Sequence, residues 1–334
     1  MEKSFENALR AKRRTALPGI LLAAAECAPL SKTGGLADVV GALPRELISL
    51  GFDARVITPY HRSAKDKYAS QVEHICDFEI SLGWRRQYVG LERLVLDGVT
   101  IYLIDNEFYF GARVYLGGER EGEQYCFFQR AVMECIPRLG FMPDVLHCSD
   151  WHTAMLPFLI KTQYDTTPLG AIKTVLTVHN LAYQGKFSLE FVQDMLGVDS
   201  VWYRPSAIEQ DGCVNFLKAG CVFADRVTTV SPGYAREVLT PEYGEGLQGV
   251  LRCRGSEFSG ILNGIDLTVF DPARDGAVAA SYSADDLSGK SQCRAALISE
   301  ARLKDSDAPI VAMVTRMTPQ KGLDLVLESF DRLM

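Results

Sequence analysis

Short apolar segments alternate with segments of helical period along most of this chain, and this alternation constrains the fold more than any other feature. Five runs rich in Val, Leu, Ile and Ala have the length and composition of buried strands: residues 19–26, 54–58, 144–148, 173–178 and 226–230. Stretches with a helical spacing of apolar residues lie between most of them. This pattern predicts an α/β fold built on a parallel sheet.

The expected helices cover residues 36–50, 124–139, 151–164 and 232–239. Pro44 should kink the first helix and Pro137 should shorten the second, because proline lacks the amide hydrogen that a helix interior needs. Over residues 76–105 the pattern changes to alternating segments rich in Val, Leu and Tyr, broken at Gly83 and at Asp97-Gly98. This change predicts an antiparallel excursion inserted in the sheet.

The chain after Leu262 has the pattern of a linker, a helix over 290–302, a strand over 309–314 and a final helix from Lys321. The final helix carries an apolar face that we expect to be buried, formed by Leu323, Val326, Leu327 and Phe330. One strand and two helices are too few to form the sheet that such a helix normally covers. We therefore expect a tail over 1–17, a first domain over 18–262, and over 263–334 a linker and the start of a second domain that continues beyond Met334.

The composition is that of an ordinary globular protein, and it excludes several classes of function. The 334 residues are 47% apolar and 23% charged, so the chain can bury a substantial core and is not globally disordered. The formal net charge of -7 has the wrong sign for a protein that neutralises nucleic-acid phosphates. No nucleic-acid partner is therefore expected.

Cysteine usage and the short apolar runs predict a cytoplasmic protein without a membrane partner. The nine cysteines include no C-x-x-C pair, which is typical of free thiols in a reducing compartment. The longest apolar run, 20–25, is far shorter than the ~20 residues that cross a bilayer. Lys12, Arg13 and Arg14 precede this run as in a signal peptide, but cleavage after Ala25 would remove a buried strand.

The first strand leads into a glycine-containing loop, Ser31-Lys32-Thr33-Gly34-Gly35-Leu36-Ala37-Asp38. Gly34 and Gly35 let the backbone approach a ligand closely, and the helix N-terminus that follows favours negative charge. Lys32 adds a mobile positive charge. Ligands of open α/β sheets collect beyond the carboxyl ends of the strands, so this loop is a candidate phosphate site. On spacing alone, a plain turn with a solvated lysine fits equally well.

Polar clusters also follow the expected strands over 144–148 and 173–178. Their members are Asp150, Trp151, His152, His179, Asn180 and Gln184. Amides and carboxylates make directed hydrogen bonds to sugar hydroxyls, and Trp covers an apolar ring face, so these residues are candidate sugar-binding groups. We expect His147, inside its strand, to be a core histidine and His179, at a strand end, to be functional. The spacing of His147, Asp150 and His152 matches no zinc motif, so no metal is expected.

Two later segments also carry chemistry. Residues 244–249 have the spacing G-x-G-x-x-G, but no strand precedes them, so we interpret them as a mobile loop near a substrate, with Gly246 as a binding candidate. Arg316 and Lys321 follow the expected strand over 309–314. Two cations placed there can neutralise the charge that develops on a diphosphate leaving group. A solvated pair at a helix start is the alternative.

Taken together, these segments resemble the bacterial glycogen synthases and plant starch synthases, which are retaining glycosyltransferases that use ADP-glucose. The segment from Lys32 to Val40 is similar to the family signature K-T-G-G-L-A-D-V. Further family segments follow in the family's order: 150–152, 179–185, 230–235, 243–247, 262–266, Arg316 and 320–322. The resemblance extends from about Pro18 to Met334.

The resemblance implies two facing Rossmann-like lobes, the GT-B architecture. The N-terminal lobe would bind the growing α-1,4-glucan and the C-terminal lobe most of the nucleotide. By position, Lys32, Gly34 and Gly35 would lie against the diphosphate and glucose of the donor, and Asp38 and Asp150 near the acceptor.

The remaining roles implied by the resemblance concern the reacting glucose and the leaving group. His179 and Asn263 would line the glucose, while Arg316 and Lys321 would hold the diphosphate and stabilise departing ADP. Asp38 joins His179, Arg316 and Lys321 as a catalytic candidate. ADP-glucose is then a substrate and no separate cofactor is implied.

The family retains the anomeric configuration, which resembles a front-face displacement through an oxocarbenium-like state, not the two-carboxylate scheme of retaining glycosidases. The sequence has no obvious paired carboxylates, which agrees with this mechanism. In that case the barrier falls mainly through charge stabilisation on the leaving diphosphate and through orientation of the acceptor hydroxyl.

Two departures from the family pattern qualify the resemblance. Phe270 stands where the family commonly has Trp, which keeps an aromatic platform. The family's E-x-x-C-G-L segment, with a Glu at the catalytic centre, would lie beyond Met334, so we expect this chain as given to be an inactive fragment. Two alternatives stay open: a non-catalytic α-glucan-binding protein, and a related transferase that uses UDP-glucose.

Overall fold

The computed structural model describes residues 17–304, 306–318 and 321–333, and the chain divides into two compact units between Asp266 and Leu267. The tail expected over 1–17 lies, apart from Leu17, outside the described residues. Each unit is described by itself below. Within the described residues, no helix combines the length and the apolar character that a membrane crossing requires.

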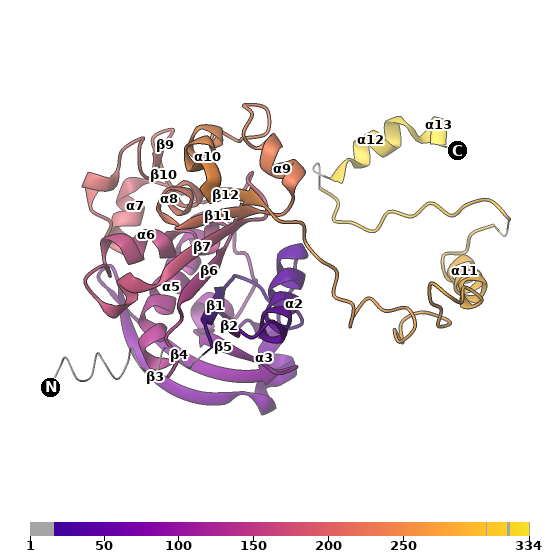
Figure 1. Cartoon of the computed structure of the whole chain (residues 1–334), viewed down its shortest axis with the longest axis horizontal. Helices are drawn as coiled ribbons and strands as arrows, with labels where there is room; N and C mark the ends of the chain where they lie inside the picture. Colours follow the sequence, from indigo (N-terminus) through magenta and orange to yellow (C-terminus); the bar gives the residue numbers. More distant parts are fainter. Residues whose placement is uncertain (1–16, 305, 319–320, 334) are drawn as a thin grey trace. The chain divides into compact units, whose positions relative to one another are not determined.

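One large sheet organises the first unit (Figure 1), with the strand order β12-β11-β7-β6-β1-β2-β5-β4-β3. The bounds of its strands are β1 Gly19–Ala23, β2 Asp53–Pro59, β3 Glu73–Leu82, β4 Arg85–Leu96, β5 Val99–Asp105, β6 Val145–Ser149, β7 Lys173–Val178, β11 Arg226–Thr229 and β12 Phe258–Gly260. The strands from β12 to β5 pair in parallel, whereas β4 is antiparallel to both β5 and β3. The expected parallel sheet with an antiparallel excursion is confirmed.

The turns of the excursion lie where the sequence predicts them. β3 and β4 are joined at Gly83, whose φ is +63°, and β4 and β5 at Asp97-Gly98, with φ values of +51° and +78°. A two-residue turn in which both φ angles are positive matches the right-handed twist of a hairpin, and Asp-Gly is a preferred pair for it.

The order of the parallel strands reverses direction between β1 and β6. From β1 the chain proceeds to β2 and β5 on one side, and then through β6, β7 and β11 on the other. In open α/β sheets this reversal leaves a crevice outside the carboxyl ends of the strands, where ligands bind. The loops after β1, β6 and β7 therefore define the place to look for a site.

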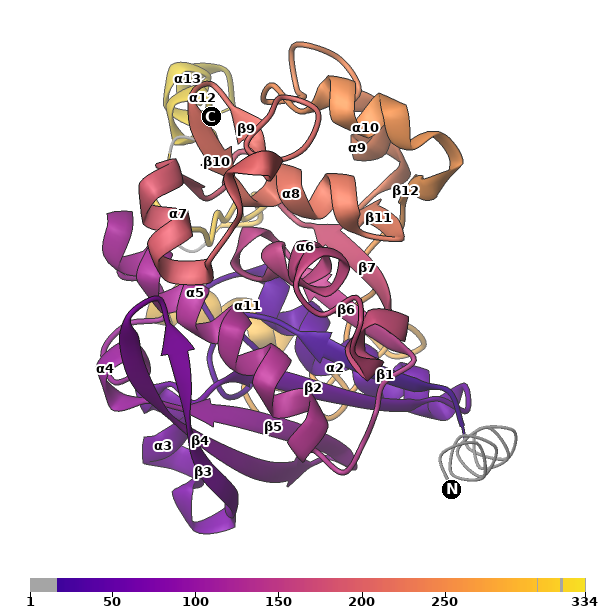
Figure 2. The same ribbon diagram turned by 90° about the vertical axis from the view of Figure 1, so that its left-hand side faces the viewer.

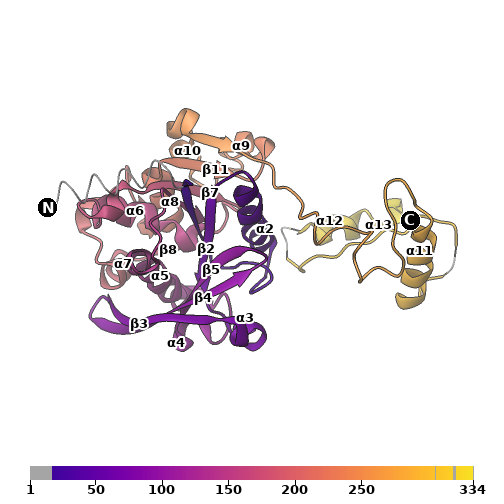
Figure 3. The ribbon, with the colours of Figure 1, turned by 60° about the horizontal axis from the view of Figure 1, so that its bottom comes forward.

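Helices cover both faces of the sheet (Figures 2 and 3). One face carries α2 Gly35–Ser49 and α3 Arg62–Tyr68. The opposite face carries α5 Gly118–Cys135, α6 Met155–Thr162, α7 Leu189–Leu196 and α8 Phe216–Phe223. Side chains of β1 alternate between the two cores: Leu21 and Ala23 pack on the second face, Leu22 and Ala24 on the first.

Shorter elements complete the unit. They are the helices α4 Glu107–Phe110, α9 Pro232–Glu237 and α10 Gln248–Arg254, the small sheet of β8 Lys186–Phe187, β9 Glu209–Gln210 and β10 Cys213–Asn215, and the 3-10 turns Ala69–Gln71, Ile136–Arg138, Trp151–Thr153, Pro168–Ala171, Ser200–Trp202 and Gly255–Glu257. α5 gives way to a 3-10 turn at Pro137, as predicted, and Pro44 lies inside α2.

The second unit contains α11 Gly289–Glu300, α12 Leu323–Glu328 and α13 Phe330–Leu333. The strand expected over 309–314 is wrong, because those residues pair with no strand among the described residues, and a strand exists only through its neighbours. The apolar face of the last helix is exposed among the described residues, which agrees with the expectation that too few elements are present to cover it. Leu327 is 74% exposed and Phe330 50% exposed in this unit.

Candidate active site

The K-T-G-G loop runs from the end of β1 to the start of α2. Gly34 precedes the helix with an extended backbone, φ -158° and ψ -168°, which any residue can adopt. A Cβ atom added to Gly34 or Gly35 would meet nothing within 4 Å. Neither backbone conformation nor packing within the described chain therefore requires glycine at these two positions, which leaves the space in front of the loop open to a ligand.

The charges of this loop are paired with each other. Lys32 Nζ lies 2.7 Å from Asp38 Oδ1, and the side chains are 51% and 38% exposed. An exposed pair of this kind contributes only about 0–1 kcal/mol. Lys32 can therefore leave Asp38 and pair with an anionic ligand at the loop at little cost in free energy.

A buried carboxylate, that of Glu26, is hydrogen-bonded to this loop. Glu26 is 3% exposed and accepts hydrogen bonds from the Thr33 amide, from Thr33 Oγ1 at 3.0 Å and from Tyr115 Oη at 2.7 Å. Sequence reasoning missed Glu26 and Tyr115. The available signal was an acidic residue directly after the apolar run Ile20 to Ala25.

Asp150 joins the ends of β6 and β7. Its backbone has φ +56°, an uncommon conformation for a residue other than glycine. Its Oδ1 accepts hydrogen bonds from the amides of His179 at 2.7 Å and Asn180 at 3.3 Å. Burial raises the pKa of Asp150 to about 6. The carboxylate thus positions the turn after β7, a role that the sequence did not indicate.

The two histidines of these strands have different surroundings. His147 Nε2 lies 2.7 Å from Thr177 Oγ1, so it is satisfied within the sheet. The ring nitrogens of His179 have no hydrogen-bond partner among the described residues. Burial lowers the pKa of His179 to about 4, so its ring is neutral at pH 7 and can exchange hydrogen bonds with a sugar hydroxyl.

Trp151 and His152 belong mainly to the core. Trp151 is 5% exposed, and its ring packs against those of Tyr125, Phe187 and Phe216. The His152 and Trp151 rings are tilted by 32° with their centroids 4.1 Å apart, and His152 Nε2 lies 3.6 Å from Glu121 Oε1.

Gln184 connects three segments. Its Nε2 donates to the carbonyls of Leu181 at 3.1 Å and Glu245 at 2.9 Å, and its Oε1 accepts from Asn215 Nδ2 at 2.6 Å. These bonds bring the loop over 244–249 next to the residues that follow β7. Gly246 in that loop has φ +80°, a conformation that favours glycine.

A pocket of about 440 Å³ opens beside these loops. Its lining combines aromatic and polar groups: Gly118, Glu121, Trp151, Ala182, Tyr183, Gln184, Gly185, Lys186, Phe187 and Glu245. Aromatic faces with a few polar groups are typical of sites for polyhydroxyl ligands. Its charged residues, Glu121, Glu245 and Lys186, carry a net negative charge, which disfavours an anion such as a diphosphate.

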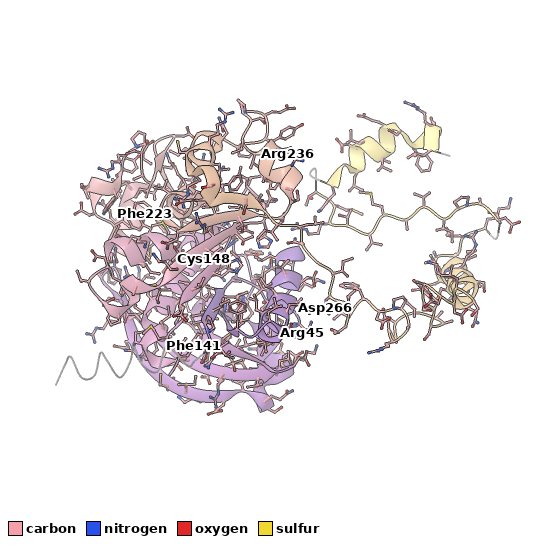
Figure 4. The ribbon with its side chains drawn as sticks, in the orientation of Figure 1. Arg45, Phe141, Cys148, Phe223, Arg236 and Asp266 are labelled. Atoms are coloured by element: carbon pink, nitrogen blue, oxygen red, sulfur yellow. The ribbon has the colours of Figure 1, made fainter. Side chains whose placement is uncertain are left out.

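The other candidates lie at or beyond the end of the first unit. Asn263 is exposed in the segment that leaves β12, and the nearby Asp266 pairs with Arg45 of α2 (Figure 4). Arg316 and Lys321 are exposed residues of the second unit, so their place in a common site with His179 stays a prediction. Among the described residues, no three His, Cys, Asp or Glu side chains are grouped as ligands of a metal ion.

The strand order and the cluster of loops at its reversal define this unit as the Rossmann-like lobe of a GT-B glycosyltransferase. The catalytic domain of starch synthase IV from Arabidopsis thaliana, solved with ADP and acarbose, superposes with a TM-score of 0.85 at 30% identity, covering 95% of this chain and 66% of that one. The family described as the starch synthase catalytic domain matches residues 19–253. This chain belongs to that family of hexosyltransferases.

Relatives from bacteria agree with this assignment. The chain is 46% identical over 317 residues to a glycogen synthase of Streptococcus sanguinis and 45% identical over 318 residues to one of Streptococcus equi subsp. equi. Each alignment covers 94% of this chain and 67% of the relative. The chain thus spans about two thirds of the length of these glycogen synthases.

Proposed function

We propose that the protein transfers glucose from ADP-glucose to the non-reducing end of an α-1,4-glucan with retention of configuration. The observation that carries the proposal is the open space in front of Gly34 and Gly35, at the reversal point of the sheet. The family membership supports the activity, and the related structure solved with ADP and acarbose supports the two ligand classes.

The donor would approach the K-T-G-G loop. The backbone before α2 can receive the diphosphate because a helix N-terminus favours negative charge. Lys32 would exchange Asp38 for the phosphate oxygens, which frees the Asp38 carboxylate to face the acceptor. His179, neutral at pH 7, would bond to a glucose hydroxyl, with Asn263 on another side of the ring.

The glucan would occupy the 440 Å³ pocket. Glu121 and Glu245 can accept hydrogen bonds from sugar hydroxyls, while Trp151 and Phe187 offer apolar surface. The net negative charge of this pocket makes it unsuited to the diphosphate, so donor and acceptor are assigned to separate places.

Arg316 and Lys321 would stabilise the departing ADP. Charge on the leaving diphosphate develops only in the transition state, so cations placed there lower the barrier to transfer. In a longer version of the chain that carries the family's E-x-x-C-G-L segment, we expect Lys321→Ala to reduce turnover by roughly 10²-fold, the effect of losing one oxyanion donor. Unchanged turnover in a steady-state ADP-release assay would remove Lys321 from the mechanism.

The activity itself is tested with ADP-[14C]glucose and a maltooligosaccharide primer on a version of the chain that carries the family's E-x-x-C-G-L segment, and the same version is used for every KM measurement. We expect label in a lengthened glucan, an equal amount of ADP released, an α-configured new linkage by NMR, and weak competition from UDP-glucose. Binding of the maltooligosaccharide without transfer from either donor would overturn the proposal in favour of a glucan-binding protein. Preferential transfer from UDP-glucose would overturn the choice of donor.

A further inference from the structure

We propose that Glu26 is a positioning residue for the donor, because it fixes the centre of the K-T-G-G loop and couples it to Tyr115. This inference rests on the proposed function, since the loop is taken to meet the donor. Glu26 is 3% exposed and meets the loop at Thr33.

The hydrogen bonds of Glu26 account for both of its carboxylate oxygens. Oε2 accepts from the Thr33 amide, and Oε1 accepts from the Thr33 and Tyr115 hydroxyls. All three partners donate to Glu26, but only the Thr33 amide must donate, because a hydroxyl can also accept. Glutamine can keep the bond from the Thr33 amide through its oxygen, but its NH₂ group then stands where both hydroxyls now find an acceptor.

The charge of Glu26 is not balanced by a cation. No Lys, Arg or His forms an ion pair with it among the described residues. Burying an unpaired carboxylate is costly unless hydrogen bonds compensate, and neutral packing of similar volume is often as stable. The compensation that the structure shows is the set of three hydrogen bonds to Thr33 and Tyr115, which also hold the loop.

The anchor acts at the middle of the loop. Thr33 is tied through both its amide and its hydroxyl, while open space lies in front of Gly34 on one side and the exposed Lys32 on the other side pairs with Asp38. Because Thr33 is held in place, the backbone of its neighbours is held as well. The loop then has less conformational entropy to lose when a diphosphate binds.

Tyr115 extends the anchor toward the acceptor pocket. Its ring lies 4.9 Å from that of His152, and His152 in turn approaches Glu121 in the pocket wall. Glu26 thus connects the donor loop to a wall of the pocket through one aromatic pair. Tyr115 reaches the pocket wall through His152, whose own contacts with Trp151 and Glu121 hold it in place, so loss of Glu26 should disturb the donor loop more than the pocket.

The test compares Glu26→Gln with the pair Thr33→Val and Thr33→Ser. Thr33 is exposed, so its variants alter the anchor without risk to folding, and serine restores the hydroxyl. Hydrogen exchange of residues 31–35 reports the loop in the free protein, and KM values for ADP-glucose and for the maltooligosaccharide report the two substrates separately.

We expect Glu26→Gln and Thr33→Val to speed exchange in 31–35 and to raise KM for ADP-glucose by about 10-fold or more, the loss of one charge-assisted bond. KM for the glucan should change less than about twofold. Thr33→Ser should restore the exchange rate of residues 31–35 and the KM for ADP-glucose. Combining Glu26→Gln with Thr33→Val should raise this KM by less than the product of the two single effects.

Two results would overturn the role of Glu26. One is unchanged exchange in the loop of Glu26→Gln, and the other is an equal rise in KM for both substrates. If the unaltered protein neither binds nor uses ADP-glucose, the proposed function fails. Exchange in the loop then still decides whether Glu26 holds it.

Discussion

At the scale of single residues, Gly41 inside α2 and Gly34 just before it are glycines for different reasons. A Cβ atom at Gly41 would lie 2.5 Å from the carbonyl oxygen of Ala28, so packing within the chain excludes a side chain there. At Gly34 the same atom would meet open space. Packing within the chain therefore requires glycine at position 41. At position 34 packing does not require it, and we attribute the glycine there to contact with a ligand.

This contrast gives a matched pair of variants. We expect Gly34→Ala to change the free energy of unfolding by less than about 0.5 kcal/mol while weakening ADP-glucose binding by about 10-fold. Gly41→Ala should destabilise by about 1–3 kcal/mol through overpacking. Urea unfolding and calorimetric titration with ADP-glucose measure the two effects. Normal donor binding by Gly34→Ala would contradict the placement of the donor.

At the scale of elements, the carboxyl ends of β6 and β7 are joined by one side chain. The Asp150 amide extends the pairing of β6 with β7 by donating a hydrogen bond to the Thr177 carbonyl at 3.0 Å. The Asp150 carboxylate accepts hydrogen bonds from the amides of His179 and Asn180. The direction of His179 therefore depends on the turn after the neighbouring strand.

We expect Asp150→Ala to lower the free energy of unfolding by about 1–3 kcal/mol, because two amides lose their acceptor. Asp150→Asn keeps an oxygen acceptor and tolerates the positive φ, so it should retain most of the stability. Urea unfolding of both variants measures the difference. Equal stability of the alanine and asparagine variants would show that the two amides do not depend on the side-chain oxygen.

At the scale of the whole molecule, buried neutral histidines link stability to pH. His61 is 2% exposed, with Nε2 3.1 Å from the Ala25 carbonyl oxygen, and burial lowers its pKa to about 4 from 6.5. Burial lowers the pKa values of His147 and His179 in the same direction. Burial of Asp150 acts oppositely, because its raised pKa makes the native state bind more protons between its two pKa values.

The sign for the histidines follows from proton counting. Between about pH 4 and 6.5 these histidines are protonated in the unfolded state but stay neutral in the native state, so acidification destabilises the native state. For His61 alone the loss amounts to roughly 3 kcal/mol. We expect unfolding by urea to become easier from about pH 7 to about pH 4.5. His61→Gln, which keeps an amide donor for Ala25, should reduce this loss.

His74 provides the control for this prediction. It is exposed, and its hydrogen bond to Glu92 raises its pKa, so His74→Gln should leave the acid destabilisation in place. A pH dependence that responds equally to His61→Gln and His74→Gln would contradict the assignment to buried rings.

The amino-acid sequence by itself determined the features that depend on neighbours along the chain. The strands β1, β2, β6, β7 and β11, the turns at Gly83 and Asp97-Gly98, and the glycine loop after β1 follow from local apolar patterns and turn residues. The order of motifs along the chain also indicates the family.

Only the tertiary structure decided which distant residues share a task. Tyr115 meets Glu26 across 89 residues of sequence, and Asp150 meets His179 across 29. It also corrected the strand over 309–314, whose apolar composition is insufficient without a partner strand. The physical reason is common to these cases: hydrogen bonds between segments and strand pairing depend on distances in space, which local sequence patterns do not encode.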